Sequence, residues 1–456
     1  MGLSLGLPLE PVRVSAPPPP MTVSSPVNPS TVYAATSEGT YRSRNAGASW
    51  SQVHAVPMAM DLVINASDTT RLFVACGSLN STANPGLYFS QDAGTSWTQM
   101  TIGLPLSNVG RTGLAISSRN PSVLYAGIAN ASSSAILGIY KTTNAGGTWS
   151  LASSVNYVGS QGWYNNVVTL RPGATDTLYC AGLNIHRSTD GAATLPSIST
   201  TGVHVDQHAI AFDPVNPDVM YFGNDGGIFK STNGGTTFMN INNNFMTTQF
   251  YPGFAYSETD TNLFIAGLQD NGTIKHTGNG YWSQIFGGDG GWCAIDPLHN
   301  NLLYFEFQYL QLYKSVNGGI SAGPIMSGLP IGASNANFIP PFVMSPSSPS
   351  VLYAGNKNVY KTTNGGLLWF APNGGANLNG TNVACIGVSK TSPDTLLAGT
   401  GSGALGASST FEVFASTNGG QSWTSVSAGL PNRYPTDIEF DPTNSAVVYL
   451  TYSGYG

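Results

Sequence analysis

Ser43–Trp50 reads SRNAGASW, and the same eight-residue pattern returns as SQDAGTSW at Ser90–Trp97 and as TTNAGGTW at Thr142–Trp149. Further copies begin at Ser188, Ser231, Ser315, Thr362 and Ser416, and a degenerate copy lies near His276–Trp282. The average spacing of about 47 residues is the length of one four-stranded blade of a β-propeller. This repeat therefore decides the fold class before any local pattern is considered.

Each period has the same order of elements. A first strand ends at a proline turn, as in AIAFDPVNP, and is followed by a second strand such as VMYFG and a third such as GIFKST. Short strands separated by Asn, Gly and Pro are typical of an all-β repeat. In the octapeptide, Asn or Asp at the third position can accept backbone N–H groups, Gly at the fifth tolerates positive φ, and Trp at the eighth packs between sheets. We interpret the octapeptides as fold-stabilising turns rather than catalytic sites.

The chain is poor in charge. Only 8% of its 456 residues are Asp, Glu, Lys or Arg, and its formal net charge is -6, whereas an average soluble protein has roughly 25% charged residues. With 16 Lys and Arg residues it lacks the basic surface that nucleic acids or anionic membranes require. No apolar run approaches the roughly 18 residues of a membrane helix. We expect no nucleic-acid partner, no membrane insertion and no cofactor.

The four cysteines have neither CxxC spacing nor zinc-ligand spacing. Each lies in an apolar strand pattern, as in LFVACG and TLYCAG, and unbonded cysteine behaves as a small hydrophobic residue. We predict that Cys76, Cys180, Cys293 and Cys385 are buried free thiols.

The octapeptide resembles the Asp-box of the bacterial neuraminidase repeat families, which include sialidases, sortilin-type receptors and xyloglucanase-type glycoside hydrolases. The resemblance covers residues 20–456. The ordered segments GWYN, HVDQHAIAFDP, GNDGGIFKST, TQFY, GLQDNGT and GGDGG are similar to those of large secreted bacterial proteins of glycosyl-hydrolase-like or sorting-domain type. This resemblance and the Asn/Thr-rich composition imply an extracellular protein, although the N-terminus MGLSLGLPLE has no intact signal peptide. Asn165 stands where the resemblance leads us to expect Asp.

We predict an all-β Asp-box propeller with about nine four-stranded blades and a partial tenth. Residues 1–19 are expected to end a preceding blade or form a linker, and residues 20–456 to form the blades, so both termini look cut from a longer protein. One unusually large ring and parts of two tandem seven-bladed rings remain alternatives. We favour two rings, with a boundary near residues 330–345. The sequence does not indicate an oligomeric state.

Polar departures from the repeat fall in loops between the fourth and first strands and between the second and third strands. These loops share one rim of a propeller, here called the top, opposite the octapeptides. We therefore expect the departures from four consecutive blades to meet there. The candidate catalytic carboxylates are Asp206, Asp225, Asp270 and Asp289. The candidate substrate-binding residues are His204, His208, Trp163, Tyr164, Asn165, Gln269, Asn271 and Tyr251.

These residue types suit glycoside hydrolysis, which needs two carboxyl groups about 5 Å apart for retention or about 6.5–9.5 Å apart for inversion. A polysaccharide or other glycan is the expected partner, with the aromatic rings available to stack on sugar. Glycan binding without turnover is an alternative, and so are purely structural turns, because Asp-Gly is an ordinary turn sequence. A rival from another class is a non-catalytic adhesion or assembly scaffold. Sialidase action is rejected, because arginines are few and the FRIP motif is absent.

A metal site is a further alternative. Strand alternation would place His204, Asp206 and His208 on one side, where they could join Asp225 as ligands. We favour a hydrogen-bonded His–Asp–His ladder that closes the mouth of the channel, and we predict no metal.

Overall fold

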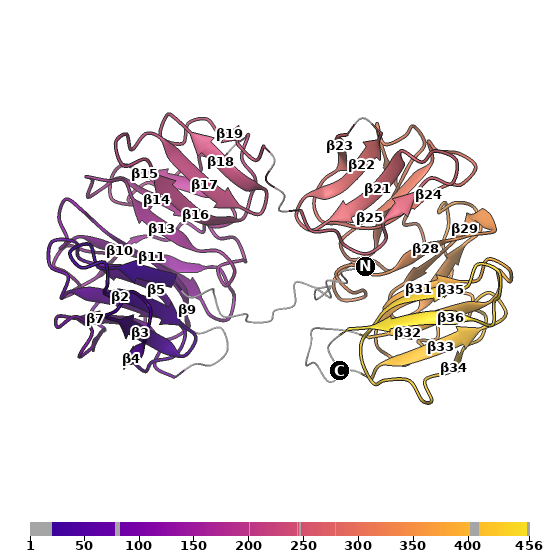
Figure 1. Cartoon of the computed structure of the whole chain (residues 1–456), viewed down its shortest axis with the longest axis horizontal. Coiled ribbons are helices and arrows are strands. Elements are labelled where there is room, and N and C mark those ends of the chain that lie inside the picture. Colours follow the sequence, from indigo (N-terminus) through magenta and orange to yellow (C-terminus); the bar gives the residue numbers. More distant parts are fainter. Residues whose placement is uncertain are drawn as a thin grey trace. The chain divides into compact units, whose positions relative to one another are not determined.

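The computed structural model describes residues 21–77, 83–199, 201–243, 245, 248–278, 280–401 and 410–453. These residues form strands and turns, and none of them is helical (Figure 1). They make up ten antiparallel sheets in which strands that follow one another in the sequence pair side by side. The chain is therefore an all-β, multi-blade β-propeller protein, as predicted. The prediction for residues 1–19 lies outside the described residues.

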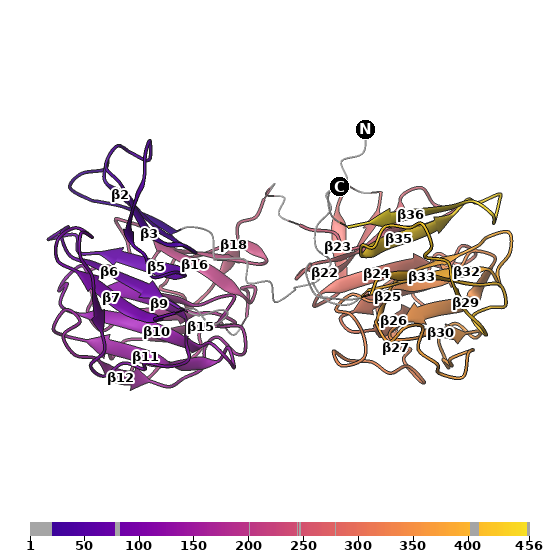
Figure 2. The ribbon, with the colours of Figure 1, turned by 90° about the horizontal axis from the view of Figure 1, so that it is seen from below.

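The chain divides into two compact units, the N-terminal unit Ser15–Thr247 and a C-terminal unit that contains Thr248–Gly456. The N-terminal unit has four sheets of four strands and one of three (Figures 1 and 2). Its first two blades are β1 (Met21–Ser24), β2 (Val32–Thr36), β3 (Gly39–Ser43), β4 (Ser51–His54) and then β5 (Ala59–Ile64), β6 (Leu72–Cys76), β7 (Gly86–Ser90), β8 (Thr98–Met100). The next two are β9 (Val109–Ile116), β10 (Leu124–Asn130), β11 (Ile136–Thr142), β12 (Ser150–Ser153) and then β13 (Val167–Leu170), β14 (Leu178–Ala181), β15 (Ile185–Ser188). The fifth is β16 (Gln207–Phe212), β17 (Met220–Asn224), β18 (Gly227–Ser231), β19 (Met239–Asn240).

The C-terminal unit has sheets of four, four, three, four and two strands. Its first two blades are β20 (Ala255–Tyr256), β21 (Leu263–Leu268), β22 (Gly272–Thr277), β23 (Trp282–Phe286) and then β24 (Gly290–Ile295), β25 (Leu303–Phe307), β26 (Gln311–Ser315), β27 (Gly323–Pro324). The remaining strands are β28 (Phe342–Ser345), β29 (Ser348–Gly355), β30 (Val359–Thr362), then β31 (Val383–Val388), β32 (Leu396–Thr400), β33 (Glu412–Ser416), β34 (Thr424–Ser425), and finally β35 (Pro435–Phe440), β36 (Val448–Tyr452).

The octapeptides form one recurring hydrogen-bonded turn after the third strand of a blade. Ser43 Oγ donates to Asn45 Oδ1, and the same Oδ1 accepts the N–H of Ser49, each at 2.9 Å. Asp92 takes the equivalent place in the next copy and accepts the N–H of Ser96 at 2.8 Å. Asn and Asp are interchangeable here because the oxygen acts only as an acceptor. The predicted role of the third position is confirmed.

The fifth and eighth positions also behave as expected. Gly47 has φ 91°, and the preceding Ala46 has φ 55°, a second left-handed residue that the pattern did not predict. Trp97 Nε1 donates to the carbonyl oxygen of Val53 in the preceding blade at 3.1 Å. Trp50 is 41% exposed, so the eighth position is not buried in every copy.

Neighbouring blades contact one another mainly through their first strands, as β5 does with β9 and β9 with β13, and side chains of the second strands lie in the cores between them. Leu72 and Leu124 are fully buried, and the Tyr33 hydroxyl donates to the carbonyl oxygen of Ala93 in the next blade at 3.0 Å. The four cysteines are free and buried, as predicted, and burial raises the pKa of the Cys76 thiol to about 12. Desolvation disfavours a thiolate, so this residue contributes packing rather than reactivity.

The expected ring boundary near residues 330–345 lies inside the C-terminal unit, whose division from the N-terminal unit falls between Thr247 and Thr248. Around the expected boundary, Leu312 of β26, Phe342 of β28 and Leu352 of β29 belong to one hydrophobic core. The contacts therefore do not separate the chain at that point. The number of rings stays a prediction.

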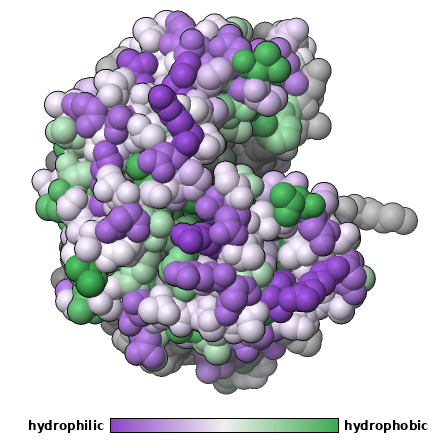
Figure 3. Space-filling model, turned by 90° about the vertical axis from the view of Figure 1, so that its left-hand side faces the viewer, coloured by the Kyte–Doolittle hydropathy of each residue, from purple (hydrophilic) through white to green (hydrophobic). Residues whose placement is uncertain are grey.

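Surface polarity is finely mixed on the part of the N-terminal unit that faces the viewer in Figure 3, where strongly apolar side chains are isolated among polar and neutral ones. The described part of the chain contains no helix that is long and apolar enough to cross a membrane.

Candidate functional site

Three segments of the N-terminal unit bring the predicted polar residues together. Gln161–Asn165 lead into β13, residues 204–206 lead into β16, which carries His208, and Asp225 lies in the turn that joins β17 to β18. Pairing of Asn224 with Gly227 closes that turn. The segments belong to two neighbouring blades, whose inner strands β13 and β16 are in contact.

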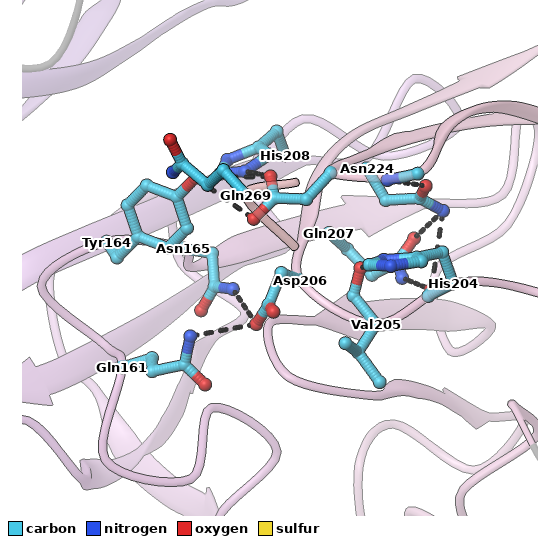
Figure 4. A network of polar contacts seen from close by, with 12 residues as sticks. Gln161, Tyr164, Asn165, His204, Val205, Asp206, Gln207, His208, Asn224 and Gln269 are labelled. Atoms are coloured by element: carbon cyan, nitrogen blue, oxygen red, sulfur yellow. Dashed lines mark hydrogen bonds and ion pairs between the residues drawn. The ribbon is translucent and has the colours of Figure 1, made fainter. Parts of the chain in front are cut away.

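Asp206 is 8% exposed and is held by side chains from the neighbouring blade (Figure 4). Its Oδ1 accepts Gln161 Nε2 at 2.9 Å and Asn165 Nδ2 at 3.1 Å. Burial raises the pKa of Asp206, and the nearby Asp225 carboxylate raises it further, while the two amide donors lower it. Asp206 is thus a carboxyl group that binds its proton more tightly than an exposed Asp does.

Asp225 has a different set of partners. The Tyr164 hydroxyl lies 3.1 Å from both of its carboxylate oxygens, and His208 Nε2 lies 2.6 Å from Oδ1. The Tyr164 ring meets the His208 ring edge-on at 4.7 Å, and Trp163 packs beside Tyr164 at 5.4 Å. The Asp225 side chain is 8% exposed. These contacts fix Asp225 as a hydrogen-bond acceptor in a largely desolvated position.

The loop Gln161–Asn165 is supported from the blade before it. Arg111 Nη1 donates to the carbonyl oxygen of Tyr164 at 2.7 Å. Asn166 Nδ2 donates to the carbonyl oxygens of Arg111 and Gly127 at 2.9 and 2.8 Å, and the Tyr157 hydroxyl donates to Asn166 Oδ1. Buried and half-buried side-chain bonds therefore hold the residues that contact the two carboxylates.

The expected alternation of His204, Asp206 and His208 along one strand is wrong. β16 begins only at Gln207, and Asp206 has φ 61°, a left-handed conformation that no regular strand contains. His204 Nδ1 lies 3.0 Å from the carbonyl oxygen of Val205, whereas Asp206 turns toward the side-chain amides of Gln161 and Asn165 (Figure 4). His208 instead contacts Asp225. The His–Asp–His ladder is replaced by two separate carboxylate environments.

The other candidates form a cluster of their own in the C-terminal unit. Asp289 is 7% exposed; its Oδ1 accepts the N–H of Asp270 at 2.9 Å and its Oδ2 accepts Gln308 Nε2 at 2.5 Å. The N–H of Gln269 donates to the carbonyl oxygen of Gln249 at 3.0 Å, which joins the TQFY segment to the β21–β22 turn. Asn271 Nδ2 donates to the carbonyl oxygen of Gln269 at 3.1 Å.

Tyr251 completes this second cluster. It is 5% exposed, and its N–H donates to the carbonyl oxygen of Gly267 at 3.0 Å, just as the N–H of Gln269 reaches Gln249. The structure therefore brings Asp206 with Asp225, and Asp270 with Asp289, each pair within its own unit. That both pairs share one rim stays a prediction.

Several residues of these clusters were not among the sequence candidates. Gln161 stands two positions before Trp163 in a segment that departs from the repeat, which was the available signal. Arg111 is one of few arginines in the chain and lies inside an otherwise apolar strand. Gln308 precedes Tyr309 and Leu310 in a turn where other blades have Gly or Asn, and this departure could have revealed it.

Across the described residues, no group of three or more His, Cys, Asp or Glu side chains is placed to hold a metal ion. His208 and Asp225 form a pair, while Asp206 is bonded to amides. The arrangement offers proton-transfer groups and hydrogen-bonding groups to a ligand.

No protein-family model matches the sequence, and a comparison with curated proteins gives no match. Among solved structures, a GH74 enzyme of Niastella koreensis is 18% identical, with 95% of this chain and 73% of that chain covered at a TM-score of 0.34. The GH74 xyloglucanase from Xanthomonas campestris is 15% identical over 95% and 73% of the two chains, with a TM-score of 0.35. YCF48 from Cyanidioschyzon merolae is 11% identical over 69% and 95%, with a TM-score of 0.30. Likeness at this level says nothing about the activity of this chain.

Proposed function

We propose that this chain is an extracellular, carbohydrate-directed propeller protein of glycoside-hydrolase type, in which Asp206 and Asp225 act on a glycosidic bond. The observation that carries the proposal is how the two carboxylates are held. Each is largely buried and is bonded to side chains of the preceding blade, across 41 to 61 residues of sequence. Purely structural turn residues would have no need of these distant partners.

The environment of Asp206 suits a general acid, and the environment of Asp225 suits a base or nucleophile. Burial and the neighbouring Asp225 raise the pKa of Asp206, which suits a group that donates a proton to the leaving oxygen. Asp225, held by Tyr164 and His208, is the base or nucleophile. Trp163 and Tyr164 provide aromatic surface next to the pair for a sugar ring. The octapeptide turns, which support an Asp-box assignment, and the charge-poor composition support an exported protein of this kind.

The test is the release of reducing ends from a panel of neutral polysaccharides. Asp206→Asn and Asp225→Asn should each lower the rate by about 100-fold or more, as expected for loss of a general acid or base. Activity should fall as pH rises through the pKa of Asp206, because the proton donor is then lost. Asn144→Asp, a change at an octapeptide position where Asp92 stands in another copy, serves as a matched control and should retain full activity.

The alternatives predict different results. If the wild-type protein binds a polysaccharide but releases no reducing ends, glycan binding without turnover replaces hydrolysis. If it neither binds nor cleaves any member of the panel, the carbohydrate proposal is wrong and the adhesion or assembly scaffold takes its place.

A further inference from the structure

The C-terminal unit brings a carboxylate, a carboxamide and aromatic rings together from three connections. Asp289 precedes β24, Gln308 lies between β25 and β26, and Phe338 lies in the long connection between β27 and β28. Gln308 Nε2 donates to Asp289 Oδ2, and Asp289 Oδ1 accepts the N–H of Asp270. The carboxylate and the amide are therefore held side by side.

The residue that follows Gln308 begins a group of three aromatic side chains. Tyr309 follows Gln308, and its ring meets the Phe338 ring edge-on at 5.2 Å, with an angle of 90° between the planes. Phe338 in turn meets Tyr251 at 6.5 Å. The N–H of Tyr309 donates to the carbonyl oxygen of Phe338 at 2.8 Å, so the backbone also joins the two aromatic residues.

The segment that carries Phe338 is anchored to another blade. The neighbouring Asn337 is 4% exposed, and its Nδ2 donates to the carbonyl oxygen of Gly401 at 3.1 Å. Its Oδ1 accepts Asn382 Nδ2 at 2.8 Å. A ring held on a segment tied in this way loses little conformational freedom when it receives a ligand.

The turn that presents Gln308 and Tyr309 is strained. Tyr309 has φ 59° and Leu310 has φ 67°, so two bulky residues in succession occupy the left-handed region. Such a conformation is unfavourable for a residue with a Cβ, and it persists only where the surroundings over-determine it. Strained backbone of this kind clusters at ligand sites, which makes the turn an indication of function.

A buried acid lies beneath the turn. Glu306 is fully buried, and one of its carboxyl oxygens, Oε2, accepts the N–H of Trp292 at 3.1 Å. Burial raises the pKa of Glu306 well above its usual range, while bonds from the N–H groups of Trp292 and Leu310 lower it. Its other oxygen, Oε1, has no hydrogen-bond partner among the described residues. Keeping this acid buried without a full set of partners is costly.

We propose that Asp289, Gln308, Tyr309 and Phe338 form a binding site for an uncharged saccharide ring. The carboxylate accepts and the carboxamide both donates and accepts, which matches neighbouring hydroxyl groups of a sugar. The aromatic rings offer apolar surface to the C–H face of the ring. The acidic Asp270 and Asp289 repel anionic sugars. This site is built entirely from the C-terminal unit, and it goes beyond the proposed function of Asp206 and Asp225.

The experiment uses the full chain with Asp225→Asn, so that any turnover is removed while binding is measured. Isothermal titration with cellohexaose, xylohexaose and mannohexaose should find at least one neutral ligand, and trigalacturonate should not bind. Gln308→Ala and Tyr309→Ala should each weaken that binding by about tenfold or more. Tyr256→Ala is the matched control, because Tyr256 is a 65% exposed aromatic residue of the same unit outside the cluster.

Amide hydrogen exchange locates the binding site without the Gln308→Ala and Tyr309→Ala variants, so this part of the test does not depend on whether those variants fold. In the Asp225→Asn chain, the bound hexasaccharide should slow amide exchange in residues 287–292 and 306–311. Binding that leaves both segments unprotected, binding that Gln308→Ala and Tyr309→Ala leave unchanged, or no binding of any neutral hexasaccharide would overturn the proposal. Absence of hydrolysis at Asp206 and Asp225 would leave this result standing, because binding at the C-terminal unit is measured in a chain without turnover.

Discussion

Asp61 is the carboxylate whose protonation should leave the clearest mark on stability. Its oxygens accept the N–H groups of Leu62 and of Leu114 in the next blade, both at 2.7 Å. Burial nevertheless raises the pKa of Asp61 to about 6, against the lowering effects of these bonds and of Arg111. Desolvation is therefore the dominant influence on this group.

A raised carboxyl pKa means that the folded state binds the proton more tightly than the unfolded state. The stabilisation is fully present below about pH 4 and is lost as pH rises through about 6. We expect the contribution of Asp61 to the free energy of unfolding to fall by about 1–3 kcal/mol from pH 4 to pH 7. Urea unfolding across this range should show the slope in the wild type, and Asp61→Asn should reduce it by the contribution of this one group.

Asp92 provides a control, because its pKa is shifted in the opposite direction to that of Asp61. Hydrogen bonds from the side chain and N–H of Ser96 lower the pKa of Asp92 to about 2. Its stabilisation is present above about pH 4 and is lost as pH falls toward 2. Asp92→Asn should therefore change the pH dependence of unfolding only on the acidic side, below about pH 4. An unchanged slope between pH 4 and pH 7 in Asp61→Asn would show that Asp61 is not the group that titrates there.

At the scale of the element, two Gly-Leu-Pro turns, each of which follows a blade that contains an octapeptide, share a backbone conformation but differ in what surrounds them. Gly103 and Gly429 have φ 82° and 83°, which favours glycine at both. A Cβ at Gly103 would collide with the carbonyl oxygen of Trp149 in the next blade, whereas a Cβ at Gly429 meets nothing within 4 Å.

Substitutions at these two glycines separate the cost of the left-handed backbone conformation from the cost of a collision with the backbone of Trp149. Gly429→Ala should cost about 1 kcal/mol of unfolding free energy, because only the left-handed conformation opposes it. Gly103→Ala should cost about 1–3 kcal/mol more, because the backbone of Trp149 must also move. Chemical denaturation of the two variants gives the difference directly. Equal losses would mean that the turn yields without disturbing the next blade.

At the scale of the whole molecule, each unit has hydrophobic cores of its own. Leu124 lies in a core of the N-terminal unit and Leu352 in a core of the C-terminal unit, and both are fully buried. Two compact units with separate cores are expected to unfold as separate cooperative transitions.

Calorimetry tests this independence. Leu124→Ala should destabilise one transition by about 2–5 kcal/mol and Leu352→Ala the other, because each leaves a cavity in a single core. Each variant is the control for the other. A single transition that both substitutions lower together would contradict independent units.

The strands and octapeptide turns could be read from the sequence because their causes are local. The bonds that Asn45 accepts from Ser43 and Ser49 span two and four residues, and strands show as alternating apolar residues between Pro, Gly and Asn. A repeated local pattern is then enough to specify a repeated blade.

The candidate site depended on contacts between distant parts of the chain. Asp206 meets Gln161 across 45 residues, and Asp225 meets Tyr164 across 61. Because Asp206 has a left-handed φ, the strand alternation expected for His204 and His208 does not occur. The sequence alone determined the blade, its turns and the buried cysteines, because short-range hydrogen bonding and apolar periodicity specify them. Only the tertiary structure decided which carboxylates are neighbours and which amides hold them, because those depend on how one blade packs on the next.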